Sequence, residues 1–376
     1  MKIGKFKLKH YINYIVIGIF AAVMAGIVFT GGQLDRSVVY LMEKIAISMI
    51  LAVSLSLVVG FLGELSLGHA GFMCVGAYIG GKVASLLMPT MGNGLETFLI
   101  ALAAGAGAAA VCGIIIGIPA LRLRGDYLAI VTLAFGEIVR SLFRNSPEEL
   151  FGGAIGLPTP RFDRKYFFLI CFVLVLVTLF VVQNLMRSKH GRSITAIRDN
   201  EIAARATGTN VTKYKLIAFT LSAAFAGIAG VLYSYSNYTI QHSNFDYNYS
   251  IEILVMVVLG GMGNINGSLI SAALITFLNT KLATILTGDL AVLQNLLYAL
   301  ILIVIVIYNN APALKGFRDK YNIGNLFAKL RKNHDPSNVK DDEAKWDVVP
   351  TKISMDEILS VDLTPQDFNM ENGGEQ

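Results

Sequence analysis

Apolar residues occur along this chain in runs of about 20, separated by short polar segments. A run of that length is what an α-helix needs to cross roughly 30 Å of hydrocarbon, and the alternating strands of roughly ten residues typical of a membrane barrel are not seen. The pattern predicts an all-α integral membrane protein with about ten transmembrane helices. The predicted spans cover residues 11–29, 38–60, 70–88, 97–118, 128–144, 166–186, 212–235, 250–263, 265–286 and 290–308.

Basic segments flank the predicted spans and set their orientation. They lie at residues 1–9, 121–125, 186–215 and 314–321. Positively charged flanks stay in the cytoplasm, and six spans before the third segment with four after it place all four segments there. Both termini are therefore expected in the cytoplasm. A signal peptide would also begin with a basic region, but no small-residue cleavage site follows, so we interpret 11–29 as a retained first span.

Glycine interrupts the apolar pattern in two segments. GFLGELSLGHAGF begins at Gly60, and VLGGMGNINGS occupies 258–268. In a loose alignment, Gly60 and Gly63 match Gly260 and Gly263. Glycine-interrupted apolar segments are typical of broken or re-entrant helices beside a translocation path, where unpaired backbone groups must face protein or water. The same glycines also suit close packing of unbroken helices, and the sequence leaves both interpretations open.

Ionisable side chains within the apolar segments mark contacts or pathways, because a charge in the bilayer is costly unless it faces protein or water. Glu137 and Arg140 are three residues apart on a predicted helix and can neutralise each other on one face. Glu64 and His69 lie in the first glycine-rich segment. They either line a path or tie helices together.

The loop at 187–211 carries the signals of a short helix. Asp199 or Asn200 is placed to cap its start, and Gly208 to close it in the left-handed conformation. Thr209 or Asn210 then caps the next span.

This helix, predicted from Glu201 to Thr207, is too short to fold alone and must be held by the flanking spans. It presents Arg198, Glu201 and Arg205 to a partner outside the membrane, or it is a plain surface turn. The two interpretations carry equal weight on this segment alone.

Composition agrees with the membrane assignment and excludes several functions. Of the 376 residues, 54% are hydrophobic and 15% charged, and the mean hydropathy is +0.59, far above that of a soluble domain. The net charge of +5 does not indicate nucleic acid, because the basic residues flank spans. Cys74, Cys112 and Cys171 lie inside apolar runs, so we expect packing residues and no disulfide or metal site.

Enzymatic motifs are incomplete. The segment from Gly76 has the spacing of a phosphate-binding loop through Gly81 and Lys82, but Val83 stands where Ser or Thr must hold magnesium. We expect a transporter with no cofactor of its own. A permease domain over 1–310 is followed by a polar, acidic tail at 311–376, predicted to be largely disordered.

Four motifs in order resemble one family. They read GELSLGHAGFMCVGAYIGG, LRLRGDYLAIVTLAFGEIVR, SKHGRSITAIRDNEIAARATGTNVTKYKLIAFTLSAAFAGIAGVLY and VMVVLGGMGNINGS. Across about residues 35–310 the chain resembles the LivM-type permease subunit of branched-chain amino acid ABC importers.

The resemblance implies the ten-span architecture of the larger importer type in a bacterial cytoplasmic membrane, in contact with lipid. It also implies a heterodimer with a second homologous permease, two cytoplasmic ATPase subunits, and an extracytoplasmic binding protein that delivers leucine, isoleucine or valine. An ion-coupled secondary transporter, or a permease for another small solute, is the alternative.

Carried over by position, the resemblance places the coupling loop on Glu201, Ala203, Ala204 and Gly208. Together with the interpretation of the short helix and of the glycine-rich segments, it gives two groups of expected functional residues. The ATPase-coupling group is Arg198, Asp199, Glu201, Ala203, Ala204, Arg205 and Gly208. The translocation-pathway group is Gly63, Glu64, Ser66, His69, Gly260, Gly263 and Asn264. Two departures from the family are visible: its coupling glutamate stands one place later, and it generally has glutamine where this chain has Glu64.

Overall fold

The structure is a computed structural model, and it describes most of residues 35–285. Spans 11–29 and 290–308 and the tail at 311–376 lie outside this part, apart from isolated positions. The described residues are 35–285 without 93, 124–125 and 161–163, together with residues 18, 299, 300 and 303.

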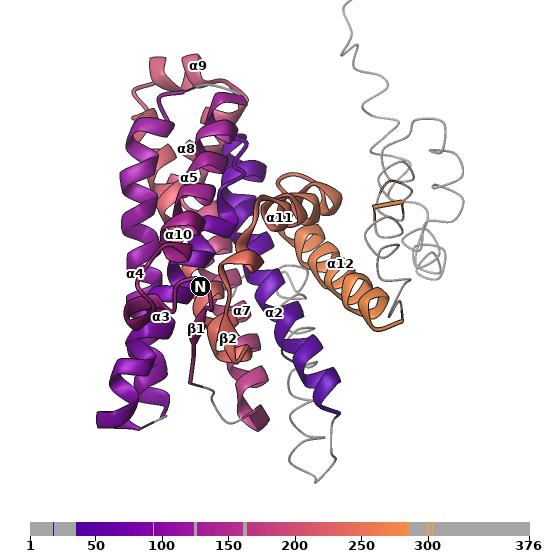
Figure 1. Cartoon of the computed structure of the whole chain (residues 1–376). Coiled ribbons are helices and arrows are strands. Elements are labelled where there is room, and N and C mark those ends of the chain that lie inside the picture. The colour runs from indigo at the N-terminus through magenta and orange to yellow at the C-terminus, as the bar shows by residue number, and fades with distance from the viewer. Residues whose placement is uncertain are drawn as a thin grey trace, which may run out of the picture. The chain divides into compact units, whose positions relative to one another are not determined.

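Long helices joined by short turns make up the described chain (Figure 1). The long ones are α2 (Arg36–Ser56), α3 (His69–Met91), α4 (Leu95–Ala120), α5 (Asp126–Arg144), α7 (Arg164–Arg187), α10 (Val211–Ser236) and α12 (Ile265–Ile285). The shorter ones are α6 (Glu148–Phe151), α8 (Lys189–Asp199), α9 (Glu201–Ala206), α11 (Tyr247–Gly260), the π-helix η2 (Leu57–Leu62) and the 3₁₀-helix η3 (His242–Phe245). Two-residue strands β1 (Leu157–Pro158) and β2 (Thr239–Ile240) pair antiparallel, Leu157 opposite Ile240.

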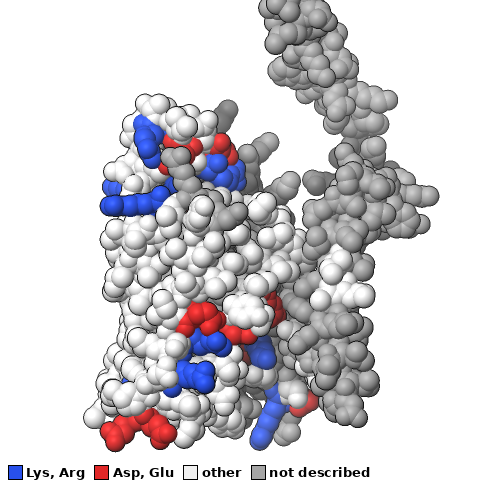
Figure 2. Space-filling view, turned by 45° about the horizontal axis from the view of Figure 1, so that its top comes forward, with Lys and Arg blue, Asp and Glu red and all other residues white. Residues whose placement is uncertain are grey.

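Six helices of the described part are long and apolar enough to cross a membrane: Arg36–Leu62, His69–Met91, Leu95–Ala120, Phe167–Arg187, Val211–Ser236 and Ile265–Ile285. Each corresponds to a predicted span, which confirms the all-α membrane fold. Figure 2 shows a broad uncharged band between charged zones on one face.

Two predicted spans differ from these six. α5 forms over the predicted 128–144, but charged residues interrupt its apolar character, so it does not meet the same criterion. α11 is apolar and has 14 residues, a rise of about 21 Å, which is shorter than the bilayer core. The predicted break between 250–263 and 265–286 is confirmed, because α11 and α12 are separate helices.

Backbones approach one another closely where α3, α4 and α10 pack together. A Cβ added at Gly76 of α3 would lie 2.3 Å from the carbonyl oxygen of Gly227 in α10. A Cβ added at Gly105 of α4 would lie 2.8 Å from the carbonyl oxygen of Gly76 and 2.3 Å from Cγ2 of Val231. Small residues drive such packing in membranes, where lipid is as apolar as any side chain. These contacts fix the positions of α3, α4 and α10 relative to one another.

Gly105→Val is expected to lower the stability of the detergent-solubilised chain by about 1–3 kcal/mol, because the new side chain overlaps α3 and α10. Gly107→Val, on the same helix, is the matched control, since nothing lies within 4 Å of a Cβ added there. Thermal unfolding followed by intrinsic fluorescence measures the difference. Equal midpoints for the two variants would contradict the packing described for α4.

Candidate functional site

The first glycine-rich segment interrupts a helix. α2 continues into η2, which ends at Gly63 with a φ of +79°, in the left-handed region that favours glycine. Residues 63–68 form no helix, and α3 begins at His69. A π-helix of this kind is frequent at functional sites. We call residues 57–68 the first interruption.

The second glycine-rich segment separates α11 from α12, and we call residues 261–264 the second interruption. Gly261 and Gly263 both have positive φ. The two interruptions touch, because a Cβ added at Gly60 would lie 2.6 Å from the backbone nitrogen of Gly263. A side chain at Gly60 would overlap the facing backbone. The two segments that align loosely in sequence are therefore in direct contact, although the touching glycines, Gly60 and Gly263, are not an aligned pair.

The loop between α7 and α10 forms α8 and α9 at one end of the bundle (Figure 1). The predicted short helix is α9, and Asn200 caps it by accepting a hydrogen bond from the Ala203 N–H at 3.0 Å. Gly208 has the predicted left-handed conformation, with φ at +82°. Asn210 caps α10 by accepting from the Lys213 N–H at 3.1 Å. Of the paired alternatives for the caps, Asn200 and Asn210 are the residues used.

A small hydrophobic cluster joins α8 and α9 to the first interruption and to α10. Its buried members are Leu62, Ile194, Ile197, Ala204, Val211 and Ala218. α8 is not among the helices predicted from the sequence. Ile194 and Ile197, three residues apart, are the apolar spacing that could have indicated it. The cluster holds both short helices in place although neither would fold alone.

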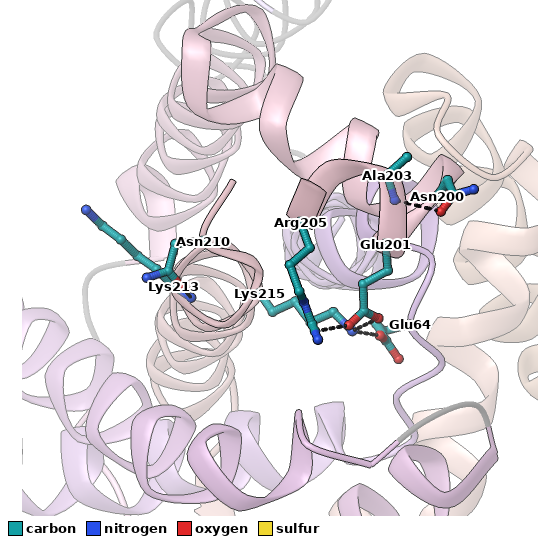
Figure 3. A network of polar contacts seen from close by, with 8 residues as sticks. All are labelled: Glu64, Asn200, Glu201, Ala203, Arg205, Asn210, Lys213 and Lys215. Atoms are coloured by element: carbon teal, nitrogen blue, oxygen red, sulfur yellow. Dashed lines mark hydrogen bonds and ion pairs between the residues drawn. The ribbon is translucent and has the colours of Figure 1, made fainter. Parts of the chain in front are cut away.

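Lys215 of α10 connects the first interruption to α9 through two ion pairs (Figure 3). Its Nζ lies 2.5 Å from Oε1 of Glu64 and 3.1 Å from Oε2 of Glu201. Arg205 binds the other oxygen of Glu201, Oε1, at 2.8 Å. Figure 3 shows these four side chains converging, whereas Lys213 points away from them. They form a chain of alternating charge that carries no net charge.

Arg198 makes a second connection, from α8. Its Nη1 donates to the carbonyl oxygen of Gly60 at 3.2 Å, and its Nη2 pairs with Asp199 at 2.9 Å. A Cβ added at Gly63 would lie 2.7 Å from Cγ of Arg198, so the arginine stem lies directly against this glycine. Arg198 and Glu201, expected to face a partner, are thus engaged with other parts of the same chain.

The outer surface of α9 presents other residues. Ile202 is 78% exposed, and the Arg205 side chain is 63% exposed. Ala203 is exposed beside them, whereas Ala204 is buried in the small cluster. Sequence reasoning missed Ile202, whose signal is a large apolar side chain among the polar residues of a loop.

The remaining residues expected near a pathway lie around the two interruptions. Ser66 and His69 are buried. The His69 ring nitrogen Nε2 is hydrogen bonded with Oγ of Ser54 at 2.7 Å, which ties α3 to α2. Asn264 is exposed and accepts a hydrogen bond from the Gly267 N–H at 3.2 Å, at the start of α12. Of the two alternatives for His69, this structure shows the contact between helices.

Two further carboxylates within helices are paired. Glu137 makes the predicted ion pair with Arg140 at 2.7 Å. Glu43 of α2 is buried and accepts a hydrogen bond from Ser236 of α10 at 2.5 Å. Glu43 is not among the ionisable residues predicted to matter, although it is a charged residue inside the predicted span 38–60. Among the described residues, no group of His, Cys, Asp and Glu side chains is arranged to hold a metal ion.

Known proteins are similar to this chain in sequence. The family described as the permease component of branched-chain amino acid transport systems matches residues 37–307. The high-affinity branched-chain amino acid transport system permease protein LivM of Salmonella typhimurium is 38% identical over 275 residues, which are 65% of this chain and 63% of the relative. The probable LivM of Methanocaldococcus jannaschii is 30% identical over 256 residues, 58% of this chain and 73% of the relative.

A sugar permease is also related. The ribose import permease protein RbsC of Escherichia coli is 28% identical over 295 residues, 72% of this chain and 84% of the relative. The chain spans less than two thirds of the length of the Salmonella LivM protein. No solved structure matches. Because the family match covers, from residue 37 onward, the six described helices that are long and apolar enough to cross a membrane, both interruptions and the α8–α9 loop, this chain belongs to the permease components of branched-chain amino acid transport systems.

Proposed function

We propose that this chain is one permease subunit of an ATP-driven importer of the branched-chain amino acids leucine, isoleucine and valine. A second, homologous permease completes the pathway, two ATPase subunits hydrolyse ATP, and an extracytoplasmic binding protein delivers the amino acid. The observation that carries this proposal is the contact of the α8–α9 loop with the first interruption. Through this contact, a loop that lies outside the spans touches the helix that ends at the first interruption.

The α9 end of the bundle is the cytoplasmic end in this proposal. The loop that forms α8 and α9 belongs to segment 186–215, which contains more lysine and arginine residues than the other three flanking segments. Basic loops remain on the cytoplasmic side. Both termini, and the tail at 311–376, would then also be cytoplasmic. The membrane is the bacterial cytoplasmic membrane, and lipid surrounds the outer helices.

The outer surface of α9 is the proposed docking point for an ATPase subunit. An apolar side chain as exposed as Ile202 favours burial against a partner, worth on the order of 1.5–3 kcal/mol. The caps at Asn200 and Gly208 keep α9 short and fixed in direction. The proposed coupling residues are Arg198, Asp199, Glu201, Ile202, Ala203, Ala204, Arg205 and Gly208.

The interruptions are the proposed part of the translocation pathway. A zwitterionic amino acid needs polar partners inside the membrane, and interrupted helices expose backbone groups that can provide them. Contacts of this kind are weak enough to release the substrate. Ser66 and His69 are buried, so they would meet the substrate only when the first interruption opens. The proposed pathway residues are Gly63, Glu64, Ser66, His69, Gly260, Gly263 and Asn264.

A permease for another small solute is the second candidate, and the likeness to a ribose permease favours it. The identity to LivM proteins is higher, at 38% and 30%, which supports an amino acid. An ion-coupled secondary transporter requires acids free to exchange protons or ions. Glu43, Glu64 and Glu137 each bind another side chain of this protein, which disfavours such a relay.

Transport is expected only from the complete assembly. In proteoliposomes, the chain with its second permease and two ATPase subunits should accumulate leucine when ATP and the binding protein are supplied. The measurement is uptake of radiolabelled leucine, with ribose as the competing solute. Uptake by this chain alone under a sodium or proton gradient would contradict the proposal, and uptake of ribose in place of leucine would favour the second candidate.

Gly208→Val is expected to reduce transport and substrate-stimulated ATP hydrolysis while membrane insertion stays normal. No atom lies within 4 Å of a Cβ added at Gly208, so the effect comes from the left-handed backbone, at a cost of about 1 kcal/mol or more for a β-branched residue. Gly208→Asn is the matched control, because asparagine tolerates this conformation. Wild-type transport by Gly208→Val would show that the conformation of this turn has no role in coupling.

Ile202→Asp is expected to weaken the association with the ATPase subunits, whereas Ile202→Leu retains it. Because the side chain is 78% exposed, neither change should affect folding of the permease itself. Co-purification of the ATPase subunits with the tagged permease, titrated with salt, measures the association. Unchanged co-purification of Ile202→Asp would place the docking surface elsewhere.

A further inference from the structure

We propose that Lys215 is a positioning residue that transmits movement of α9 to the first interruption, through the ion chain Glu64–Lys215–Glu201–Arg205. The inference rests on the proposed function, because it assumes that α9 receives the ATPase-driven movement. It adds the residue through which that movement reaches the pathway. Lys215 itself touches neither the proposed docking surface nor the proposed substrate.

The exposure of the side chains falls from Arg205 through Glu201 to Lys215, the most enclosed of the four, and Glu64 at the other end of the ion chain is slightly more exposed than Lys215. Arg205 is 63% exposed, Glu201 26%, Glu64 14% and Lys215 4%. A buried ammonium group is strongly disfavoured without a partner, and removing one member of a buried ion pair leaves an uncompensated charge. Lys215 therefore holds Glu64 and Glu201 close to it. Separating α9 from the first interruption requires one of the two contacts to break.

The two contacts of Lys215 are unequal. The contact with Glu64 is 2.5 Å long and nearly enclosed, whereas the contact with Glu201 is 3.1 Å long and its carboxylate is more exposed. Water can replace the second contact at a lower cost than the first. Under a pull on α9, the Lys215–Glu201 pair opens first, and Lys215 stays with Glu64. The position of α9 therefore determines whether Lys215 binds both Glu201 and Glu64 or Glu64 alone, and this links α9 to the first interruption.

Gly63 lies between two points of attachment. Arg198 of α8 holds the carbonyl oxygen of Gly60, before Gly63, and Lys215 holds the side chain of Glu64, after it. The left-handed φ of Gly63 makes this the position at which the chain turns out of η2. α8 and α9 are separate helices joined at Asn200, so a change in the angle between them acts on both sides of Gly63. This arrangement converts a movement of α9 into a rotation about Gly63.

The test compares Lys215→Met with Lys213→Met in the complete, reconstituted assembly. Lys213 lies on the same turn of α10, is exposed and points away from the ion chain (Figure 3), so it serves as the matched control. We expect Lys215→Met to assemble with the ATPase subunits and to hydrolyse ATP. Leucine uptake per ATP hydrolysed should fall by about tenfold, the order typical of a lost coupling between two sites. Lys215→Arg, which retains the charge, should recover part of this loss.

A second readout separates transmission from a purely structural role. Leu65→Cys, in a background without the native cysteines, reports the first interruption through its rate of modification by a maleimide. A non-hydrolysable ATP analogue should change this rate in the otherwise wild-type assembly and leave it unchanged when Lys215→Met is also present. A nucleotide effect that persists in Lys215→Met, or wild-type uptake per ATP, overturns the inference.

The outcomes distinguish this inference from the proposed function. If the wild-type assembly imports no branched-chain amino acid, the proposed function fails. If the wild-type assembly works and Lys215→Met works equally well, only the role of Lys215 fails. Glu64→Gln removes the charge and keeps a hydrogen-bond acceptor, so it is the milder variant. Should both Lys215→Met and Glu64→Gln fail to assemble, the ion chain is a folding element and the inference is withdrawn.

Discussion

A helix that stops inside a membrane leaves peptide N–H and C=O groups without partners, and hydrocarbon supplies none. In the proposed pathway, this constraint governs the arrangement around Gly60 and Gly263. Each interruption is covered by the other, at a distance that only glycine permits, and Arg198 supplies a charged donor to the carbonyl of Gly60. The short helices α8 and α9 therefore stabilise the break in addition to connecting two spans.

The same physical device, the absence of a side chain, serves two purposes in this chain. At Gly76, Gly105 and Gly227 it lets three helices meet backbone to backbone and makes a rigid frame. At Gly63 and Gly208 it lets the backbone adopt positive φ, which ends a helix and redirects the chain. The glycines that pack helices together are therefore different residues from those that end a helix and turn the chain. Other glycines with positive φ end further helices, such as Gly92 after α3 and Gly152 after α6.

The features predicted from sequence are the ones set by local chemistry. The start of α9, the left-handed Gly208 and the cap of α10 depend on residues within four positions of one another. The spans follow from hydropathy over about 20 residues. The ion pair between Lys215 and Glu64 joins residues 151 positions apart, so no local pattern contains it. The exposure of Ile202 depends on how α9 is laid against its cluster, and this too is a tertiary property.

The packing of α3, α4 and α10 at their glycines affects how the subunit fits the thickness of the bilayer. α4 has 26 residues, a rise of about 39 Å, and only 22% of its most apolar stretch is buried. A helix longer than the hydrocarbon core, roughly 30 Å thick, normally tilts to reduce hydrophobic mismatch. α4 cannot tilt independently, because Gly105 fixes it against α3 and α10. The mismatch must be met by the whole bundle or by local thickening of the lipid, which makes bilayer thickness a mechanical load on the subunit.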